Sequence, residues 1–273
     1  MITSDEFVKS NLPQISLDAH KYSRGYAFIF AGSYLMAGAA TLAGKAALKS
    51  GAGIVRLIVP ESIYPICAAS FPEAVYSLME DDVDISRADA ATFGCGAGKG
   101  ELAENTLLKL LKECEKPLLI DADGINLLSK HIDVLKHKKC PVVLTPHIGE
   151  MARLTGKSAE YISENRVEAA VDFAKDYGVT LLLKGRDTVI ASYDGGFKIN
   201  PTGTPALATA GSGDVLTGII TSFMAQGAKP FDAAVMGAYI HGLSGEIAEN
   251  KLTGRCVIAS DIIEYLKDAF KEC

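Results

Sequence analysis

The sequence predicts an α/β fold of three layers, in which a central, mostly parallel β-sheet lies between two layers of helices. Short apolar runs alternate along the chain with longer segments of helical periodicity. Several of these runs end in a glycine-rich or polar turn, which is typical of parallel strands. No Pro/Ser-rich linker, charge run or internal repeat divides the chain, so we expect a single domain over residues 1–273.

The expected elements follow one another in a regular order. Strands, each with its following turn, are expected at 26–33, 54–60, 88–100, 117–124, 141–150 and 179–185. A hairpin is expected over 188–200, turning at Asp194, Gly195 and Gly196. Helices are expected at 37–53, ended by Gly51 and Gly53, and at 101–115, 159–178, 206–227, 231–250 and 260–271. The first 15 or so residues are expected to form a short helix on the surface.

Composition favours a globular protein that acts on a small molecule. The 273 residues are 48% hydrophobic, which is enough to form a sizeable core. The net charge of −6 disfavours binding to nucleic acid or to an anionic membrane, because both are polyanions. No apolar stretch reaches the roughly 18 residues of a membrane-spanning helix, and we expect a cytoplasmic protein.

The six cysteines indicate neither a disulfide framework nor a zinc site. They form no C-x-x-C pair and no Cys/His cluster with zinc-ligand spacing. Most are expected to be buried core thiols. The cysteines are Cys67, Cys95, Cys114, Cys140, Cys256 and Cys273.

Polar residues gather at the ends of five expected strands. Ligands of open parallel sheets bind outside the carboxyl ends of the strands, so these turns are expected to meet at one crevice. The turns are Gly32–Ser33, Gly94–Gly100, Asp121–Asn126, Thr145–Glu150 and Lys184–Thr188.

The segment from Asn200 to Gly218, "NPTGTPALATAGSGDVLTG", predicts an anion-binding site. Gly211, Ser212 and Gly213 come directly before a segment whose apolar residues repeat at helical spacing. The free N–H groups and positive dipole end of such a helix attract phosphate, and glycine lets the phosphate approach closely. The same place can stabilise charge on a transferring phosphoryl group.

Asp214, at the start of this helix, has two interpretations of about equal weight on spacing alone. An acid in a first turn can simply satisfy N–H groups and the helix dipole. Beside a phosphate loop it can instead act as the general base that takes a proton from an attacking hydroxyl. The neighbouring glycines favour the base. The chain has no Walker A motif or protein-kinase loop, and "GCGAGKG" alone is weak support for a dinucleotide fold.

The glycine loop, aspartate and helix resemble those of the ribokinase-like superfamily. More narrowly, residues 16–270 resemble the ADP/ATP-dependent (S)-NAD(P)H-hydrate dehydratases, which are related to the C-terminal half of bifunctional NAD(P)H-hydrate repair enzymes. The motifs, in order, are "HKYSRGYAFIFAGS", "GAATLAGKAALKSGAG", "GCGAGKG", "LLIDADGINLL", "VVLTPHIGEMARL", "LLLKGRDTVIA", "NPTGTPALATAGSGDVLTGII" and "YIHGLSGEIAE". The resemblance implies dehydration of (S)-NADHX or (S)-NADPHX, by phosphorylation of the ring hydroxyl and elimination of phosphate.

The resemblance also implies roles for individual residues. Asp214 matches the family's aspartate at the reacting hydroxyl, where it also binds substrate. Ala39, Gly98 and His147 match substrate-binding positions. The positions that match nucleotide-binding segments are Lys184, Gly185, Arg186, Asp187, Thr188, Gly211, Ser212 and Gly213.

The family further implies ADP or ATP as co-substrate and Mg²⁺ carried by the phosphates, with no metal ligand named by the sequence. It implies a homo-oligomer, often a tetramer, that works with a separate NAD(P)H-hydrate epimerase. ADP is the commoner donor among stand-alone members of the family. The signature loop departs from the usual T-G-N-P-G-M-A-x-G-G-[ST]-G-D at Thr204, Ala206, Leu207 and Ala210, and Tyr22 and Glu246 replace a usual Gly and Asp.

Other interpretations stay open for several residues. Ala39 can be a packing residue, and His147 or Lys184 a polar residue at a strand end. Asp121, Asp123 and Asn126 can cap a helix or contact magnesium or ribose. His241 and Glu246 fit helix packing or an interface better than a site.

For the whole protein, one alternative is a kinase for a vitamin precursor of the hydroxymethylpyrimidine or hydroxyethylthiazole type. Such an enzyme would use the same anion site and the same base. A second alternative is a catalytically silent nucleotide-binding protein, which the intact Asp214 disfavours.

Overall fold

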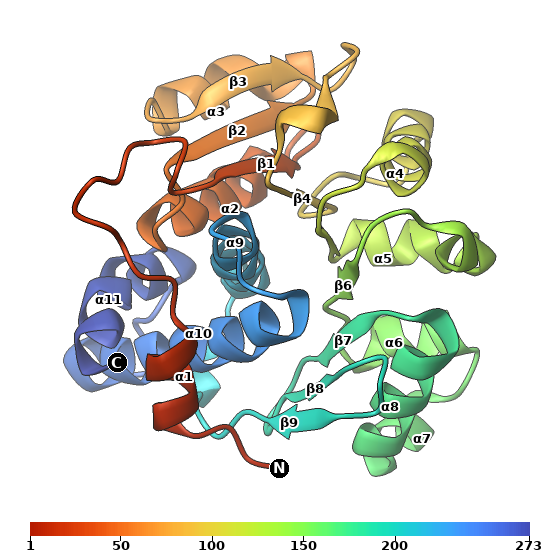
Figure 1. Cartoon of the computed structure of the whole chain (residues 1–273), viewed down its shortest axis with the longest axis vertical. Helices are drawn as coiled ribbons and strands as arrows, with labels where there is room; N and C mark the ends of the chain where they lie inside the picture. Colours follow the sequence, from red (N-terminus) through yellow and green to blue (C-terminus); the bar gives the residue numbers. More distant parts are fainter.

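The computed structural model describes all residues, Met1–Cys273, and contains one nine-stranded sheet between two layers of helices (Figure 1). The strand order is β3-β2-β1-β4-β5-β6-β7-β8-β9. Strands β1 to β7 are parallel to their neighbours, while β8 and β9 add an antiparallel hairpin. The mostly parallel α/β sheet predicted from the sequence is therefore confirmed. The strands are β1 (Tyr26–Phe30), β2 (Ile54–Val59), β3 (Val75–Leu78), β4 (Ala90–Phe93), β5 (Leu118–Ile120), β6 (Val142–Leu144), β7 (Thr180–Leu183), β8 (Val189–Ala191) and β9 (Phe197–Ile199).

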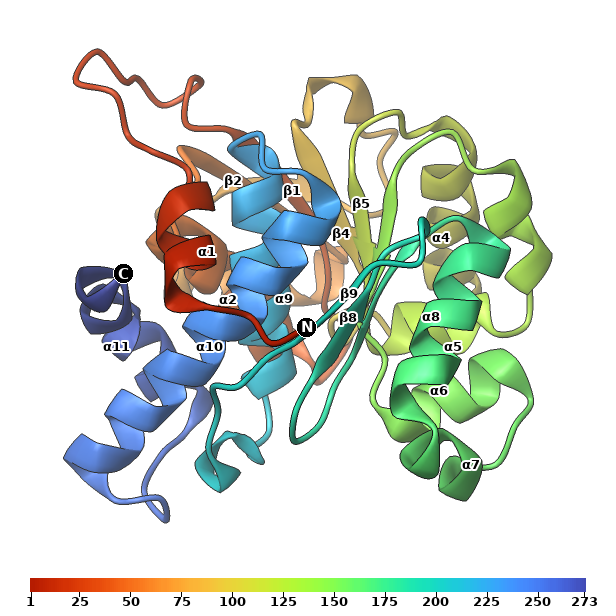
Figure 2. The ribbon, with the colours of Figure 1, turned by 60° about the horizontal axis from the view of Figure 1, so that its bottom comes forward.

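The helices divide between the two faces of the sheet (Figures 1 and 2). One face is covered by α2 (Ala37–Lys49), α3 (Tyr64–Ser70), α9 (Ser212–Ala225), α10 (Pro230–Leu252) and α11 (Ala259–Glu272). The other face is covered by α4 (Glu101–Glu113), α5 (Asp123–Leu128), α6 (Ile148–Thr155), α7 (Ala159–Glu164) and α8 (Arg166–Tyr177). The expected N-terminal surface helix is present as α1 (Asp5–Asn11), beside α10. Four short 3₁₀ segments, Glu61–Ile63, Ile85–Arg87, Ile132–His137 and Pro205–Leu207, complete the chain.

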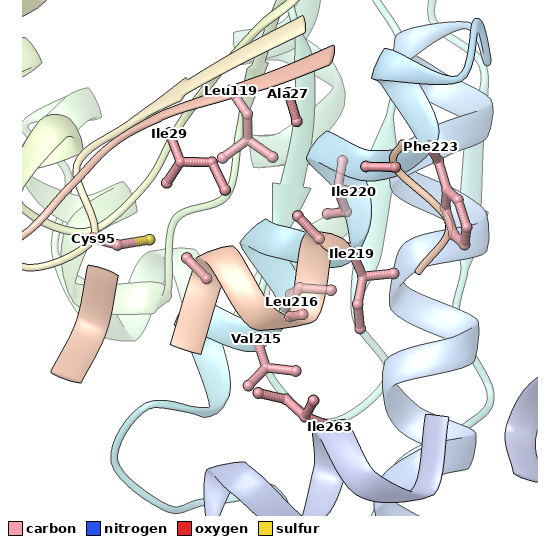
Figure 3. Close-up of a cluster of buried hydrophobic side chains, with 14 of the residues drawn as sticks. Ala27, Ile29, Cys95, Leu119, Val215, Leu216, Ile219, Ile220, Phe223 and Ile263 are labelled. Atoms are coloured by element: carbon pink, nitrogen blue, oxygen red, sulfur yellow. The ribbon is translucent and has the colours of Figure 1, made fainter. Parts of the chain in front are cut away.

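Alternate strand residues supply two separate cores, because successive side chains of a strand point to opposite faces. In β1, Ala27 and Ile29 join the core beneath α9, whereas Phe28 and Phe30 join the core beneath α4 to α8. Helix α9 is the centre of the first core, and its apolar side chains pack toward the sheet and toward Ile263 of α11 (Figure 3). A Cβ at Gly218 would lie 2.2 Å from the carbonyl oxygen of Ala43, so only glycine lets α9 approach α2 this closely.

The predicted hairpin is present as β8 and β9, but several helix boundaries were wrong. The helix expected over 159–178 breaks at Asn165, whose backbone leaves helical geometry and whose side-chain amide donates to the carbonyl oxygen of Tyr161. The helix expected from 206 begins only at Ser212, because Gly211 has a φ of +87°. Of the two glycines expected to end α2, only Gly51 has a positive φ. Strand β3 and helices α3 and α6 were not predicted.

All six cysteines are free thiols, and four of them, Cys67, Cys95, Cys114 and Cys140, are buried as expected. At the far edge of the sheet, Ile2 pairs with Ile199 of β9. None of the helices is both long enough and apolar enough to cross a membrane.

Candidate functional site

The strand order reverses between β1 and β4, which is where a ligand crevice is expected in an open parallel sheet. The chain runs from β1 outward to β2 and β3, then returns to form β4 on the opposite side of β1. Loops diverge at such a switch point and leave room for a ligand. The turns after β1 and β4 meet here, because the Gly32 amide donates to the carbonyl oxygen of Cys95 at 2.8 Å. The turns after β5, β6 and β7 continue along the same edge of the sheet, since all these strands are parallel.

The N-terminus of α9 opens onto this crevice with unsatisfied donors. No side chain caps the helix, and the N–H groups of Gly211, Gly213 and Asp214 donate to no other group of the chain. Gly211 supplies the left-handed turn that directs these amides outward. A Cβ built on Gly213 would lie 3.6 Å from Nζ of Lys184, so an anion at the amides would also meet a cation.

Asp214 is half-buried in the first turn of α9. Burial raises the pKa of its carboxyl to about 6, the charges of Asp121 and Asp123 add to this, and the Cys95 thiol and Lys184 oppose it. A carboxyl with such a pKa is ionised near neutral pH and still basic enough to accept a proton. The same environment raises the pKa of the buried Cys95 thiol, which therefore stays neutral.

Asp121 and Lys184 form a buried ion pair beside the loop. Asp121 is 1% exposed; its Oδ1 accepts from Nζ of Lys184 at 2.7 Å, and its Oδ2 accepts from Oγ1 of Thr217 at 2.9 Å. Burial alone would lower the pKa of Lys184, but the carboxylates of Asp121 and Glu150 outweigh it and raise that pKa. Lys184 is therefore a fixed cation. Asp121 does not cap α5, which has no side-chain cap.

The rest of the Lys184–Thr188 segment forms the turn between β7 and β8. Gly185, Arg186 and Asp187 are exposed, and Oγ1 of Thr188 donates to the carbonyl oxygen of Gly185 at 2.8 Å. The turn also receives the guanidinium of Arg166, which donates to the carbonyl oxygens of Leu183 and Asp187 at 3.2 and 3.4 Å. Arg166 thus holds in place the turn that was expected to contact nucleotide. This role of Arg166 was not predicted from the sequence.

His147 begins α6 on the same edge of the sheet. Its Nδ1 accepts from the amides of Gly149 and Glu150 at 2.9 and 3.2 Å, and Glu150 Oε2 accepts from the His147 amide at 2.8 Å. Burial, Lys184 and Arg153 lower the pKa of His147, so the ring is neutral with its proton on Nε2. Burial raises the pKa of Glu150. The ring is 54% exposed, and its Nε2 lies 3.4 Å from Oε1 of Glu150.

Gly98 and Ala39 lie on the opposite wall. The φ of Gly98 is +75°, and its amide donates to Oδ2 of Asp123 at 3.0 Å. Ala39 of α2 is buried beneath the same loop, and its Cβ lies 2.9 Å from the Cβ position of Gly96. A larger residue at 39 would displace this loop. The side-chain oxygen of Asn126, for which capping and ligand contact were both considered, accepts a hydrogen bond from Nε of Arg153 at 2.8 Å.

The signature loop is tied to α10 by its polar residues. Thr202 Oγ1 donates to the carbonyl oxygen of Tyr239 at 2.9 Å, and the Gly203 amide donates to Oε1 of Glu246 at 2.6 Å. The Thr204 hydroxyl donates a hydrogen bond to the carboxylate of Glu249 and accepts one from the Ala206 amide. Thr204 and Glu246, two departures from the usual family pattern, thus hold the loop in place, while Ala206 is buried and Ala210 exposed. Glu249 was not predicted.

His241 of α10 supports the glycine loop itself. Its Nε2 lies 3.0 Å from the carbonyl oxygen and 3.1 Å from Oγ of Ser212, and both residues are buried. Burial lowers the pKa of His241 to about 4, so the ring is neutral. The sequence interpretation of His241 as a packing or interface residue missed this contact, because the two residues are 29 positions apart.

Strained backbone collects around the crevice. Four residues other than glycine have a positive φ, and three of them, Leu35, Ala122 and Asp187, lie in the turns after β1, β5 and β7. Each such residue costs on the order of 1–3 kcal/mol, which the rest of the fold must offset. Strain of this kind is concentrated where a chain positions functional groups.

Comparison with known proteins identifies a consistent set of relatives. Residues 27–268 match the NAD(P)H-hydrate dehydratase family. A bifunctional NAD(P)H-hydrate repair enzyme Nnr of Moorella thermoacetica is 41% identical over 272 residues, which are 94% of this chain and 51% of that protein. The chain thus spans about half the length of such bifunctional relatives. An ADP-dependent (S)-NAD(P)H-hydrate dehydratase of Neisseria meningitidis is 37% identical over 84% of this chain and 79% of that protein.

Solved structures agree with these sequence matches. The ADP/ATP-dependent NAD(P)H-hydrate dehydratase of Bacillus subtilis, co-crystallised with ATP and Mg²⁺, superposes with a TM-score of 0.89 at 30% identity, covering 99% of this chain and 97% of that one. A hydroxyethylthiazole kinase of Pyrococcus horikoshii shares the fold, with a TM-score of 0.66 at 15% identity over 96% of this chain and 92% of that one.

Proposed function

Since this chain belongs to the NAD(P)H-hydrate dehydratase family, we propose that it converts (S)-NADHX and (S)-NADPHX back to NADH and NADPH, with ADP or ATP as co-substrate. The observation that carries the proposal is the open N-terminus of α9. Its free amides, the fixed cation Lys184 and the weakly basic Asp214 converge on one place in the crevice. Phosphoryl transfer to a hydroxyl needs an anion site, a cation and a base together.

In the proposed reaction, Asp214 accepts the proton of the ring hydroxyl while that oxygen attacks the terminal phosphorus of the nucleotide. The bond from phosphorus to the leaving phosphate breaks, releasing AMP from ADP or ADP from ATP. The amides of Gly211, Gly213 and Asp214, with Lys184, stabilise the charge on the transferring group. Loss of phosphate with a neighbouring ring proton then restores the double bond.

The remaining residues have proposed places around these groups. The nucleotide would lie along Lys184, Gly185, Arg186, Asp187 and Thr188 and end at the loop of Gly211, Ser212 and Gly213. The dinucleotide would lie against Ala39, Gly98 and His147. The half-exposed ring of His147 suits contact with substrate, and Ala39 and Gly98 suit close approach by their small size.

Mg²⁺ is proposed to arrive with the nucleotide. No three His, Cys, Asp or Glu side chains are grouped closely enough to hold a metal ion by themselves. Mg²⁺ in such enzymes is commonly held by phosphates, water and one or two carboxylates, so the residues present fit an ion carried by the nucleotide. When bound, the ion would neutralise phosphate charge.

We further propose a cytoplasmic homo-oligomer, with a tetramer as the expected state, in which residues 1–273 act as one domain. Bifunctional relatives join a hydrate repair activity of this kind to a second one in a single chain. Functional pairing with an NAD(P)H-hydrate epimerase is therefore part of the proposal.

The test is incubation of the protein with chemically hydrated NADH and, separately, ADP or ATP. Recovery of the dihydronicotinamide absorbance with either nucleotide is expected, with stoichiometric release of phosphate. Absence of recovery with both nucleotides, together with phosphorylation of hydroxymethylpyrimidine or hydroxyethylthiazole, would instead identify a vitamin kinase.

A further inference from the structure

Helix α10 contacts the glycine loop through hydrogen bonds as well as by packing. His241 is in the middle of α10, is almost completely buried, and places Nε2 within hydrogen-bond distance of both the backbone and the side chain of Ser212. Ser212 is the first residue of α9, between the two glycines whose amides face the crevice. Any movement of Ser212 would therefore move the anion-binding amides.

The two contacts together fix the tautomer of His241. A carbonyl oxygen can only accept, so the nitrogen 3.0 Å from the Ser212 carbonyl oxygen must carry the proton. A protonated Nε2 cannot accept from the Ser212 hydroxyl, 3.1 Å away, so that oxygen also accepts. The Ser212 O–H is then left as a donor, and it has no acceptor within the chain.

We propose that His241 is a positioning residue for phosphoryl transfer, which holds the glycine loop through the Ser212 carbonyl and turns the Ser212 hydroxyl proton toward the phosphate of the bound nucleotide. This proposal rests on the proposed function. The loop would then present three backbone amides and one hydroxyl to the phosphoryl group. A helix N-terminus with these donors is pre-organised, since no group has to be reoriented when the nucleotide arrives.

Two variants of His241 separate positioning from filling of space. His241→Gln places an amide N–H near the position of Nε2 and keeps a donor for the Ser212 carbonyl. His241→Asn is shorter and cannot reach it, while remaining polar. Ser212→Ala removes the hydroxyl and keeps the carbonyl. All are compared with the full-length wild-type protein, with thermal unfolding measured for each variant.

The first measurement is the affinity for ADP and for adenosine, because only ADP has phosphates to meet the loop. We expect His241→Asn to weaken ADP binding by about tenfold, the loss of one good hydrogen bond, and to leave adenosine binding unchanged. His241→Gln should restore most of the ADP affinity. Equal weakening of ADP and adenosine, or no rescue by Gln, would overturn the proposal and leave His241 as a packing residue.

The second measurement is turnover of hydrated NADH. We expect His241→Asn to lower kcat by about tenfold or more with little change in KM for the hydrate. In the double variant Ser212→Ala/His241→Asn the two losses should be less than additive, because the hydroxyl and the histidine act as a unit. Full additivity would contradict the proposed link. A wild-type protein inactive on the hydrate would refute the proposed function, and the ADP and adenosine affinities would still decide the role of His241.

Discussion

Helices α6 and α9 both begin at the carboxyl edge of the sheet, yet their first turns differ. At α6, His147 and Glu150 close the end of the helix, because the histidine accepts two amides and the glutamate accepts a third. At α9, Gly211 offers no side chain, and three amides remain without an acceptor in the chain. A capped end is stabilised by its own residues, whereas an open end needs an external anion. This difference is the reason for proposing that phosphate binds at α9 and not at α6.

The largest expected effect is that of Asp214→Asn at the open end. Loss of the base should lower kcat by about 10²–10⁴-fold with ADP affinity retained, because the glycine loop is untouched. Turnover of hydrated NADH and calorimetric titration with ADP measure the two quantities. Asp232→Asn, which removes an acid from the first turn of α10, is the matched control and should be fully active. A fully active Asp214→Asn protein would show that Asp214 is not the base.

The pH dependence of turnover should follow the same carboxyl. The pKa of Asp214 is raised to about 6, so kcat/KM should fall about tenfold per pH unit below that value, as the base becomes protonated. Stability should respond in the opposite sense. A carboxyl with a raised folded-state pKa binds protons better when folded, so its contribution to stability decreases as the pH rises from about 4 to about 6.

Activity profiles from pH 5 to 8 and urea unfolding at each pH measure both effects. Glu150→Gln keeps the closed end of α6, because glutamine also serves in a capping box, and should leave the activity profile in place. A wild-type profile that stays flat down to pH 5 would show that Asp214 is not the group that accepts the proton.

Adding a methyl group at the second residue of α9 or of α6 should change ADP affinity to different extents. In Gly213→Ala the new Cβ would lie 3.6 Å from Nζ of Lys184 and 3.7 Å from Oδ2 of Asp121, which the fold tolerates but a phosphate would not. We expect ADP affinity to fall about tenfold. In Gly149→Ala the new Cβ meets the His147 ring at 3.0 Å, and ADP affinity should not change. Equal ADP affinities for the two variants would place the phosphate elsewhere.

The smallest expected effect concerns the cap of α6. His147→Ala should lower the free energy of unfolding by about 1 kcal/mol, the usual cost of a lost N-cap, whereas His147→Asn should retain most of it. Neither should alter ADP affinity. If the ring also contacts the dinucleotide, both variants should raise KM for hydrated NADH. An unchanged KM in the asparagine variant would leave the ring with its capping role alone.

Local patterns predicted the elements and the edge of the sheet where the site lies. The buried strands are short apolar runs, and the hairpin has Gly195 and Gly196 at its turn, so both could be recognised from neighbouring residues. The edge strand β3 is only partly buried and has no strong apolar pattern, which is why it was missed. The break at Asn165 depends on one side chain bonding to the backbone, which periodicity does not register.

For the proposed site, local patterns singled out individual residues but not the contacts between them. Gly211, Gly213 and Asp214 were identified because a glycine-rich loop before an apolar helix is a local signal. The Lys184–Asp121 pair joins residues 63 positions apart, and the contact of His241 with Ser212 spans 29. Such contacts depend on how β5, β7, α9 and α10 pack, and the spacing of residues along the chain does not specify them.

The late position of α9 in the chain has a consequence for synthesis. This helix fills the core over β1 and β4 and packs against α2, although more than 180 residues separate it from the start of β1. During translation, the first strands therefore have one apolar face only partly covered, by α2 and α3, until residues 212–225 leave the ribosome. Completion of the core and assembly of the proposed anion-binding loop are then the same late event, and a nucleotide that binds this loop would favour the finished fold by mass action.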